Sequence, residues 1–228
     1  MTPSKHTLGS FDEGLTALRN NVLMMAGLAD RALDRAIKGL LQRDDNLCAT
    51  AIADDEEIDQ LEKQIDKEGV DVLLRFQPLA SDLRRVVAAM KLSPNVERIG
   101  DQATNIARRA RKLNRHPALR EIEIIVPIQA HAMAMFKDAI DAFAREDVDL
   151  GRAVVARDKD LDYMNKVANR TLTDQMAQDP KQLRGYLNLI FISRSLERVG
   201  DHATNIAEEA VYAAAAEDIR HQAAAAAT

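Results

Sequence analysis

The stretch that decides the fold is residues 97–107, ERIGDQATNIA, because it occurs a second time at residues 197–207 as ERVGDHATNIA. Nine of the eleven positions are identical, and the two copies lie 100 residues apart. An acidic segment precedes each copy, at residues 55–63 and again at 158–166. Agreement over two separate segments indicates an internal duplication. The sequence therefore predicts two tandem repeats, residues 1–115 and residues 116–228.

The composition predicts an all-α protein. The chain has 228 residues with only 9 Gly, 6 Pro, no Trp and 4% aromatic residues, while 46% of its residues are hydrophobic. An all-β sandwich or barrel needs more strand-forming residues and more turns than this. Apolar residues recur every three or four positions from Leu8 to Leu40, as they do along one face of a long helix. Two further stripes follow in each half, so we expect two tandem three-helix bundles related by a pseudo-twofold axis.

Smaller signals predict where these helices begin and end. The second stripe of the first half runs from Leu47 to Val72 and predicts one continuous helix. Pro78 suits the first turn of the third helix, and Pro180 follows Asp179 as a capped helix start. The second repeat ends in an Ala-rich C-terminal tail, residues 213–228.

Charge and targeting signals exclude several classes of protein. The 36 acidic residues exceed the 31 basic ones, and a net charge of −5 gives no electrostatic case for binding nucleic acid. The first ten residues lack the apolar run of a secretory signal, and no segment reaches the length of a membrane helix. Cys48 is alone, which excludes an intrachain disulfide and fits a reducing compartment. We therefore expect a cytoplasmic protein.

The repeated motif places acidic side chains on a helix face that the apolar stripe assigns to the core. The motif acids are four residues apart in each copy, so they share one face. The acidic segment of the preceding helix supplies a second pair at the same spacing. If these helices are neighbours, four carboxylates converge in each half. They are Asp55, Asp59, Glu97 and Asp101 in the first half, and Asp158, Asp162, Glu197 and Asp201 in the second.

Clustered carboxylates with few nearby histidines favour a site for hard metal ions. Mg²⁺, Mn²⁺ and Fe are the expected ions, and Zn²⁺ is an alternative. Asn105 and Asn205 lie one turn further on and are additional candidate ligands, while Gly100 and Gly200 leave space beside the acids. A second interpretation is a network in which arginines pair with the acids and only fix the helix register.

Sequence signatures of catalysis are missing. The chain has no Gly-rich phosphate loop, no G-x-S-x-G and no H-E-x-x-H, and it lacks the Glu-x-x-His pairs of di-iron bundles. We therefore predict that the protein is not an enzyme. The alternatives are an enzyme that uses a carboxylate-bound metal and a purely structural helical scaffold.

The duplicated motif resembles that of the PhoU family of phosphate-signalling regulators, and the resemblance extends over nearly the whole chain. It implies two three-helix bundles with metal clusters held by E/D-x-x-x-D motifs, at the eight carboxylates named above. It also implies a negative regulator of the phosphate-starvation response, the Pho regulon, and of phosphate uptake. The expected partners are the ATPase of a phosphate ABC transporter and a sensor histidine kinase of a two-component system. Such a protein is a homodimer in the cytoplasm and reaches the membrane only through its partners.

One position departs from this pattern between the two halves. Glu208 follows the second motif, where an acid fits the family, whereas the first half has Arg108. Glu208 is eleven residues after Glu197, which returns it to the same helix face. It is therefore another candidate ligand, with no counterpart in the first half.

Overall fold

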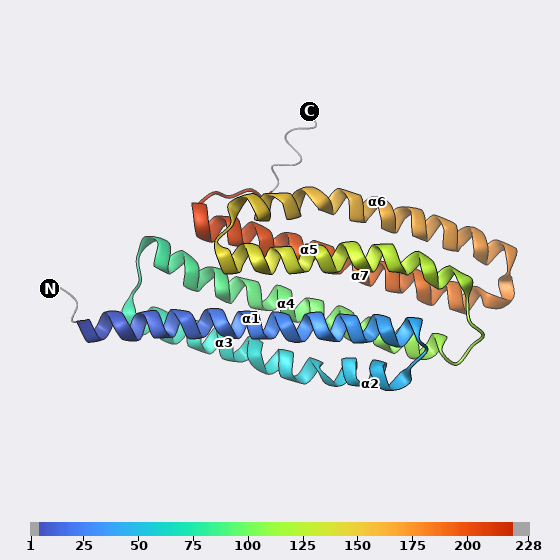
Figure 1. Cartoon of the computed structure of the whole chain (residues 1–228), viewed down its shortest axis with the longest axis horizontal. Coiled ribbons are helices and arrows are strands. Elements are labelled where there is room, and N and C mark those ends of the chain that lie inside the picture. The colour runs from blue at the N-terminus through green and yellow to red at the C-terminus, as the bar shows by residue number, and fades with distance from the viewer. Residues whose placement is uncertain (1–4, 221–228) are drawn as a thin grey trace, which may run out of the picture.

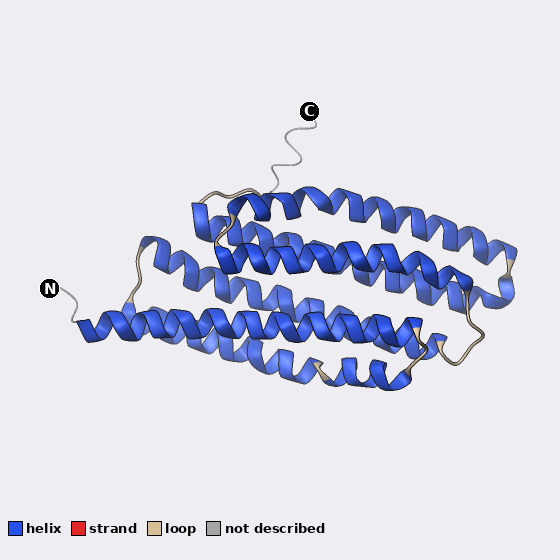
Figure 2. Cartoon of the chain, viewed as in Figure 1, coloured by secondary structure: helices blue, strands red, loops and turns tan. Residues whose placement is uncertain are grey.

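The computed structural model describes residues 5–220, with side chains from residue 9 onward, and this part of the chain is helical without any strand (Figure 2). The last eight residues of the predicted Ala-rich tail lie outside the described range. The elements in chain order are α1 (Lys5–Leu41), α2 (Asp45–Ala53), α3 (Asp55–Phe76), α4 (Ala80–Leu113), the 3₁₀ turn η1 (Arg120–Ile124), α5 (Ile125–Arg145), α6 (Val148–Gln178), the 3₁₀ turn η2 (Pro180–Gln182) and α7 (Leu183–Ala215).

The helices form two elongated bundles that lie side by side (Figure 1). The first contains α1, α2, α3 and α4, and the second contains α5, α6 and α7. Helices α4 and α7 run antiparallel and make most of the contact between the bundles. The predicted all-α fold of two tandem three-helix bundles is confirmed, with the second helix of the first bundle divided into α2 and α3.

The α4–α7 pair carries the pseudo-twofold relation between the halves. Arg84 Nε on α4 donates to the Ala213 carbonyl on α7 at 3.4 Å, and Arg109 Nη1 near the other end donates to Asn188 Oδ1 at 3.3 Å. Ile99 and Val199 are corresponding residues of the repeat, and both are fully buried. The duplicated motif therefore lies in the middle of the interface between the two bundles.

The prediction of one continuous helix from residue 47 to 72 is wrong, because the helix is interrupted at Asp54. This residue keeps a right-handed backbone, with φ −62° and ψ −21°, so the interruption is shallow. Its carboxylate pairs with Arg35 of α1. Three acids then open α3, Asp55, Glu56 and Glu57, which favours a new helix start because the N-terminus of a helix carries partial positive charge.

The two prolines behave differently at the start of the third helix of each half. Pro78 lies outside α4, which begins at Ala80, because Gln77 ends α3 in the left-handed conformation at φ 47°. Pro180 does open η2, and the Asp179 side chain accepts a hydrogen bond from the Lys181 N–H. The Asp179–Pro180 prediction is thus confirmed, whereas the one for Pro78 is wrong by two residues.

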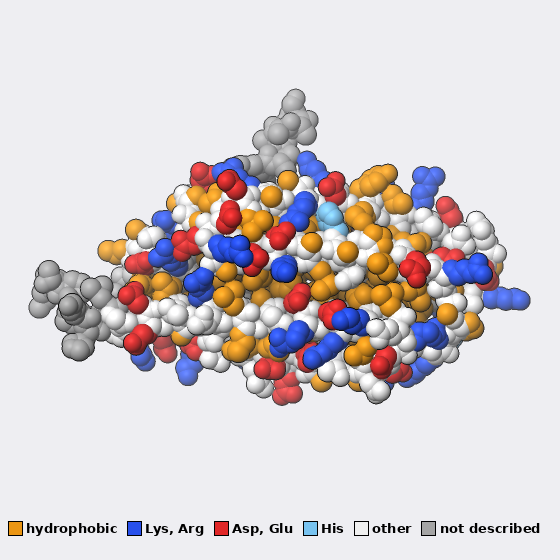
Figure 3. Space-filling view, viewed as in Figure 1, with side chains coloured by type: hydrophobic (Ala, Val, Ile, Leu, Met, Phe, Trp, Pro, Cys, Tyr) orange, Lys and Arg blue, Asp and Glu red, His pale blue; other side chains and the backbone are white. Residues whose placement is uncertain are grey.

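The surface mixes charge with apolar side chains. Figure 3 shows acidic and basic groups interspersed over one face, with no large field of a single sign. Among residues 5–220, none of the helices has the combination of length and hydropathy needed to cross a bilayer.

Candidate functional site

The glycine of each motif copy lets the neighbouring helix approach closely. A Cβ atom on Gly100 would lie 2.9 Å from Ile58 Cδ1 of α3, and one on Gly200 would lie 2.1 Å from Leu161 Cδ2 of α6. Ile58 and Leu161 are corresponding residues of the acidic segments, and both are buried. The space beside the acids is therefore filled by the partner helix. This close packing brings the carboxylates of α3 next to those of α4, and those of α6 next to those of α7.

The first carboxylate cluster lies between α3 and α4. It contains the four predicted residues, Asp55, Asp59, Glu97 and Asp101, which repel one another electrostatically. Arg98 partly neutralises the cluster, because its Nε lies 3.3 Å from Glu97 Oε2 and its Nη1 lies 3.0 Å from Asp101 Oδ2.

The second carboxylate cluster, between α6 and α7, contains the corresponding four residues: Asp158, Asp162, Glu197 and Asp201. Thr204 Oγ1 donates a hydrogen bond to Asp158 Oδ1 at 3.3 Å. Among residues 9–220, these four carboxylates have no basic side chain within 4.0 Å, although Arg194 and Arg198 act on Glu197 from further away. The second cluster is therefore the less neutralised of the two.

Burial raises the pKa of several of these acids, and the negative charge of their neighbours adds to the effect. Burial, followed by the charge of Asp101, raises the pKa of Glu97 to about 7. Loss of hydration, followed by the charge of Glu197, raises the pKa of Asp201 to about 6. Burial and a neighbouring aspartate also raise the pKa of Asp55 and of Asp158. Each cluster thus holds its ionised form at a cost that a bound cation would offset.

Carboxylate oxygens are suitable ligands for a hard cation, but the side chains of the described residues are not arranged around a common metal position. Within residues 9–220, no three Asp, Glu, His or Cys side chains surround a common point as metal ligands do. The eight carboxylates are half-buried or exposed, and none of them is fully buried. The assignment of the eight carboxylates as metal ligands stays a prediction.

The additional candidate ligands lie away from the clusters. Asn105 and Asn205 are exposed, and Asn205 Nδ2 donates to Asn95 Oδ1 at 3.1 Å across the α4–α7 interface. Glu208 lies roughly 16 Å along α7 from Glu197, since each helical residue rises about 1.5 Å. It lines a separate surface hollow together with Arg220.

The structure adds an acid that the sequence analysis did not single out. Glu62 of α3 acts electrostatically on Glu97, and burial together with the charges of Asp66 and Asp59 raises its pKa. It lies three residues after Asp59, on the same helix face, and this spacing is the signal that could have identified it. Its counterpart in the second half is a buried amide, Asn165, which accepts a hydrogen bond from Ser193 Oγ at 2.6 Å.

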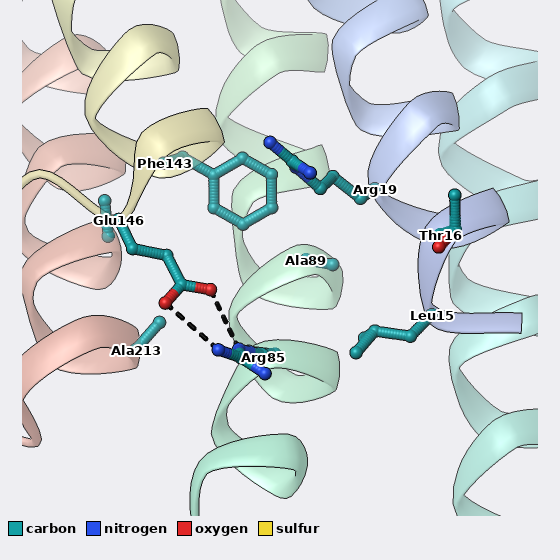
Figure 4. Close-up of a pocket in the computed structure, with 9 residues that line it drawn as sticks. Leu15, Thr16, Arg19, Arg85, Ala89, Phe143, Glu146 and Ala213 are labelled. Carbon is teal, nitrogen blue, oxygen red and sulfur yellow. Dashed lines mark hydrogen bonds and ion pairs between the residues drawn. The ribbon is translucent and has the colours of Figure 1, made fainter. Parts of the chain in front are cut away.

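A separate cavity of about 250 Å³ lies between the two bundles at the end where α5 stops (Figure 4). Two arginines enter it, and both already have partners. Arg85 pairs with Glu146 at 2.8 Å, and Arg19 donates to the Ala144 carbonyl. These contacts join α1 and α4 of the first bundle to the end of α5 in the second, and Arg85 has its counter-charge in Glu146.

Cys48 offers no nucleophile. It is fully buried, and this burial raises the pKa of its thiol to about 11, so the reactive thiolate is scarce at neutral pH.

Comparison with known proteins identifies the family. The sequence matches the PhoU domain twice, over residues 22–110 and residues 126–210. The chain belongs to the PhoU family. Its similarity to the Pseudomonas putida protein named phosphate-specific transport system accessory protein PhoU homolog is 40% identity over 217 residues, which cover 95% of this chain and 85% of that protein. The Escherichia coli K12 protein PhoU is 33% identical over 221 residues, 96% of this chain and 90% of its own.

Solved PhoU structures share the fold. The crystal structure of PhoU from Pseudomonas aeruginosa superimposes with a TM-score of 0.88 at 38% identity, covering 91% of this chain and all of that one. The Streptococcus pneumoniae protein, described as a phosphate transport system regulatory protein, gives a TM-score of 0.83 at 23% identity over 92% of this chain and 99% of its own. These two PhoU structures support the double-bundle architecture described above.

Proposed function

We propose that this PhoU-family chain is a negative regulator of the phosphate-starvation response and of phosphate uptake. In this role it acts as a non-enzymatic adaptor between the ATPase of a phosphate ABC transporter and a sensor histidine kinase, as a cytoplasmic homodimer. Family membership and the names of the Pseudomonas and Escherichia relatives support the link to phosphate transport. The kinase, the repression and the dimer come from the family resemblance of the sequence.

The observation that carries the mechanism is the gathering of four predicted carboxylates in each half. Burial, and after it the charge of neighbouring acids, raises the pKa of five of them: Asp55, Glu97, Asp158, Glu197 and Asp201. Bound Mg²⁺, Mn²⁺ or Fe would supply the positive charge that these acids lack. Asp158, Asp162, Glu197 and Asp201 would hold it in the second half, and their four counterparts in the first. With the repulsion neutralised, α6 stays packed on α7 and α3 on α4, which fixes the outer helix surfaces that partner proteins contact.

The metal part of this proposal is tested by replacing one ligand pair. Glu197→Ala combined with Asp201→Ala should lower both the metal content, measured by elemental analysis, and the melting temperature of the metal-loaded protein. Arg170→Ala combined with Asp174→Ala is the control, because both residues are exposed on α6 and lie at least eight residues beyond Asp162. An unchanged metal-to-protein ratio in the first variant would refute the site.

The adaptor part is tested in cells. Affinity purification of the chain from phosphate-replete cells should recover the transporter ATPase and the kinase, and the ligand variant should recover less of both. Purified metal-loaded protein should turn over neither a phosphoester nor peroxide. Turnover that the Glu197→Ala, Asp201→Ala variant loses would instead identify a carboxylate-metal enzyme.

A further inference from the structure

A second pocket, on the outer side of the α4–α7 pair, is lined by three arginines. It has a volume of about 220 Å³, and its guanidinium groups belong to Arg109 of α4 and to Arg194 and Arg198 of α7. Within the part of the chain that the structure describes, no acidic side chain lines it. Among residues 9–220, none of these three arginines makes an ion pair within 4.0 Å. The pocket therefore concentrates positive charge in a protein whose net charge is −5.

Arg109 shows most clearly that this charge is uncompensated. Its guanidinium stacks on the Phe191 ring, 3.8 Å from the ring centroid, and Nη1 donates to Asn188 Oδ1 at 3.3 Å. Burial lowers the pKa of Arg109, and no carboxylate of the described residues acts against that effect. A half-buried cation without a counter-charge is costly, so an anion entering the pocket would be stabilised.

The pseudo-twofold axis provides an internal comparison for this pocket. The positions of Arg109 and Phe191 correspond to Glu209 and Lys91 in the other half of the interface. There the two side chains form an ion pair, with Lys91 Nζ 3.1 Å from Glu209 Oε1. On one side of the interface Lys91 and Glu209 thus neutralise each other, whereas on the other side Arg109 has no such partner among the described residues.

Asn105, Phe191 and two buried polar side chains, Gln102 and Ser195, complete the lining. Gln102 is 5% exposed, and its Oε1 has no hydrogen-bond partner, while Ser195 is 7% exposed. Rotation of the Gln102 amide by half a turn would present its N–H groups instead. The Gln102 amide and the Ser195 hydroxyl thus add neutral polar groups to the lining beside the three arginines.

Further basic side chains continue along the end of α4. Arg108, Arg111, Lys112 and Arg115 line a shallow surface hollow there. Because a field of one sign attracts opposite charges from solution, these residues favour the arrival of an anion at this end of the molecule.

We propose that the pocket of Arg109, Arg194 and Arg198 binds a phosphate-type oxyanion, either free or as the terminal group of a phosphate monoester. Guanidinium groups bind such oxyanions through paired, charge-assisted hydrogen bonds. This site is separate from the carboxylate clusters and goes beyond the adaptor function proposed above.

Isothermal titration calorimetry on the full chain, in chelator-treated buffer, tests the site. The probes are inorganic phosphate and adenosine monophosphate. Arg109→Gln and Arg194→Gln should each weaken binding about tenfold or more, since each removes charge-assisted hydrogen bonds. Lys91→Gln is the matched control, because it removes one positive charge from the self-neutralised side of the same interface and should change the affinity less than twofold. Tighter binding of phosphate indicates a free anion, and tighter binding of adenosine monophosphate indicates a monoester.

Other outcomes overturn the proposal. The Glu197→Ala, Asp201→Ala variant should bind phosphate at least as tightly as the unchanged chain, because Arg194 and Arg198 lose the carboxylates that they act on, and the arginine variants should keep their metal content. Binding that disappears with the carboxylates but survives the arginine substitutions would place the anion on a metal instead. Absence of binding for both probes would also refute the site. If circular dichroism shows that Arg109→Gln does not fold, Arg109→Lys replaces it. Lysine keeps the positive charge but lacks the paired N–H donors of the guanidinium, so it should still weaken binding.

Discussion

The two carboxylate clusters occupy corresponding places in the two halves, but they differ in the charges beside them. In the first, Arg98 contacts both Glu97 and Asp101, and Glu62 adds a further acid. In the second, no basic side chain among residues 9–220 lies within 4.0 Å of the four acids, and Asn165 replaces the further acid. The duplication has therefore kept the acids and changed their neighbours.

This difference means that two copies of one motif can need a bound cation to different extents to balance their negative charge. The first cluster carries part of its counter-charge within the protein. The second relies on arginines that lie further away, and Arg194 and Arg198 line the pocket on the outer side of α4 and α7. We therefore expect the second cluster to gain more from bound metal than the first.

The largest expected effect is on stabilisation by metal. A saturated site contributes about 2.7 kcal/mol to the free energy of unfolding at a metal concentration of 100 times its Kd. Glu197→Ala with Asp201→Ala should remove more of the stabilisation by Mn²⁺, measured by urea denaturation, than Glu97→Ala with Asp101→Ala. Equal losses in the two variants would contradict the difference between the clusters.

The next effect concerns the close helix packing that gathers the second cluster. Gly200→Ala places a Cβ 2.1 Å from Leu161 Cδ2, so α6 and α7 must separate or Leu161 must move. We expect a loss of about 1–2 kcal/mol in urea denaturation, the overpacking cost less the gain in helix propensity. Gly27→Ala in α1 is the control, because its Cβ meets only Arg31 Nη1 at 3.6 Å and should stabilise the helix by up to about 1 kcal/mol.

The pH dependence of the metal-free protein tests the first cluster. The folded-state pKa of Glu97, about 7, lies above its ordinary 4.5, so the folded protein binds this proton more tightly than the unfolded chain. Stability should therefore fall as pH rises from 4.5 to 7, by about 1 kcal/mol once solvent screening is allowed for. Glu97→Gln should flatten this slope in denaturation curves. A stability that rises over that interval would show that the carboxyl is not held in a repelling environment.

The smallest expected effect comes from the internal counter-charge. Arg98→Gln should destabilise the metal-free protein by about 0.5 kcal/mol, because the exposed ion pairs with Glu97 and Asp101 are lost. Arg198→Gln, the corresponding change in the second half, removes no ion pair within 4.0 Å among the described residues and should cost less. If Arg198→Gln destabilises the protein more than Arg98→Gln in thermal unfolding, the second cluster, and not the first, is the one that the protein's own arginines neutralise better.

Much of the fold was predictable because it depends on periodicity and repetition. The three-and-four spacing of apolar residues gives helices, and two copies of one motif give two related bundles. The interruption at Asp54 was not predictable from that spacing, because it depends on Arg35 of another helix. The start of α4 likewise depends on the left-handed backbone of Gln77, which the apolar pattern does not encode.

The candidate site was predictable to a similar depth. Register along each helix identified the paired acids, and the structure brings the pairs of neighbouring helices together in both halves. The packing role of Gly100 and Gly200 could not be predicted from the sequence, because only the structure shows that Ile58 and Leu161 pack against them. The arginine pocket was also hidden, because it combines Arg109 with residues about 90 positions away.

Helix α7 carries both candidate sites on one rigid body. Glu197 and Asp201 face α6, while Arg194 and Arg198 line the pocket shared with α4. A rotation of α7 about its own axis that moves one set of side chains therefore moves the other. If a cation and an oxyanion both bind along this turn of helix, each changes the affinity for the other by the same factor, as thermodynamic linkage requires. The metal concentration would then change the affinity of the chain for phosphate, and the phosphate concentration would change its affinity for metal.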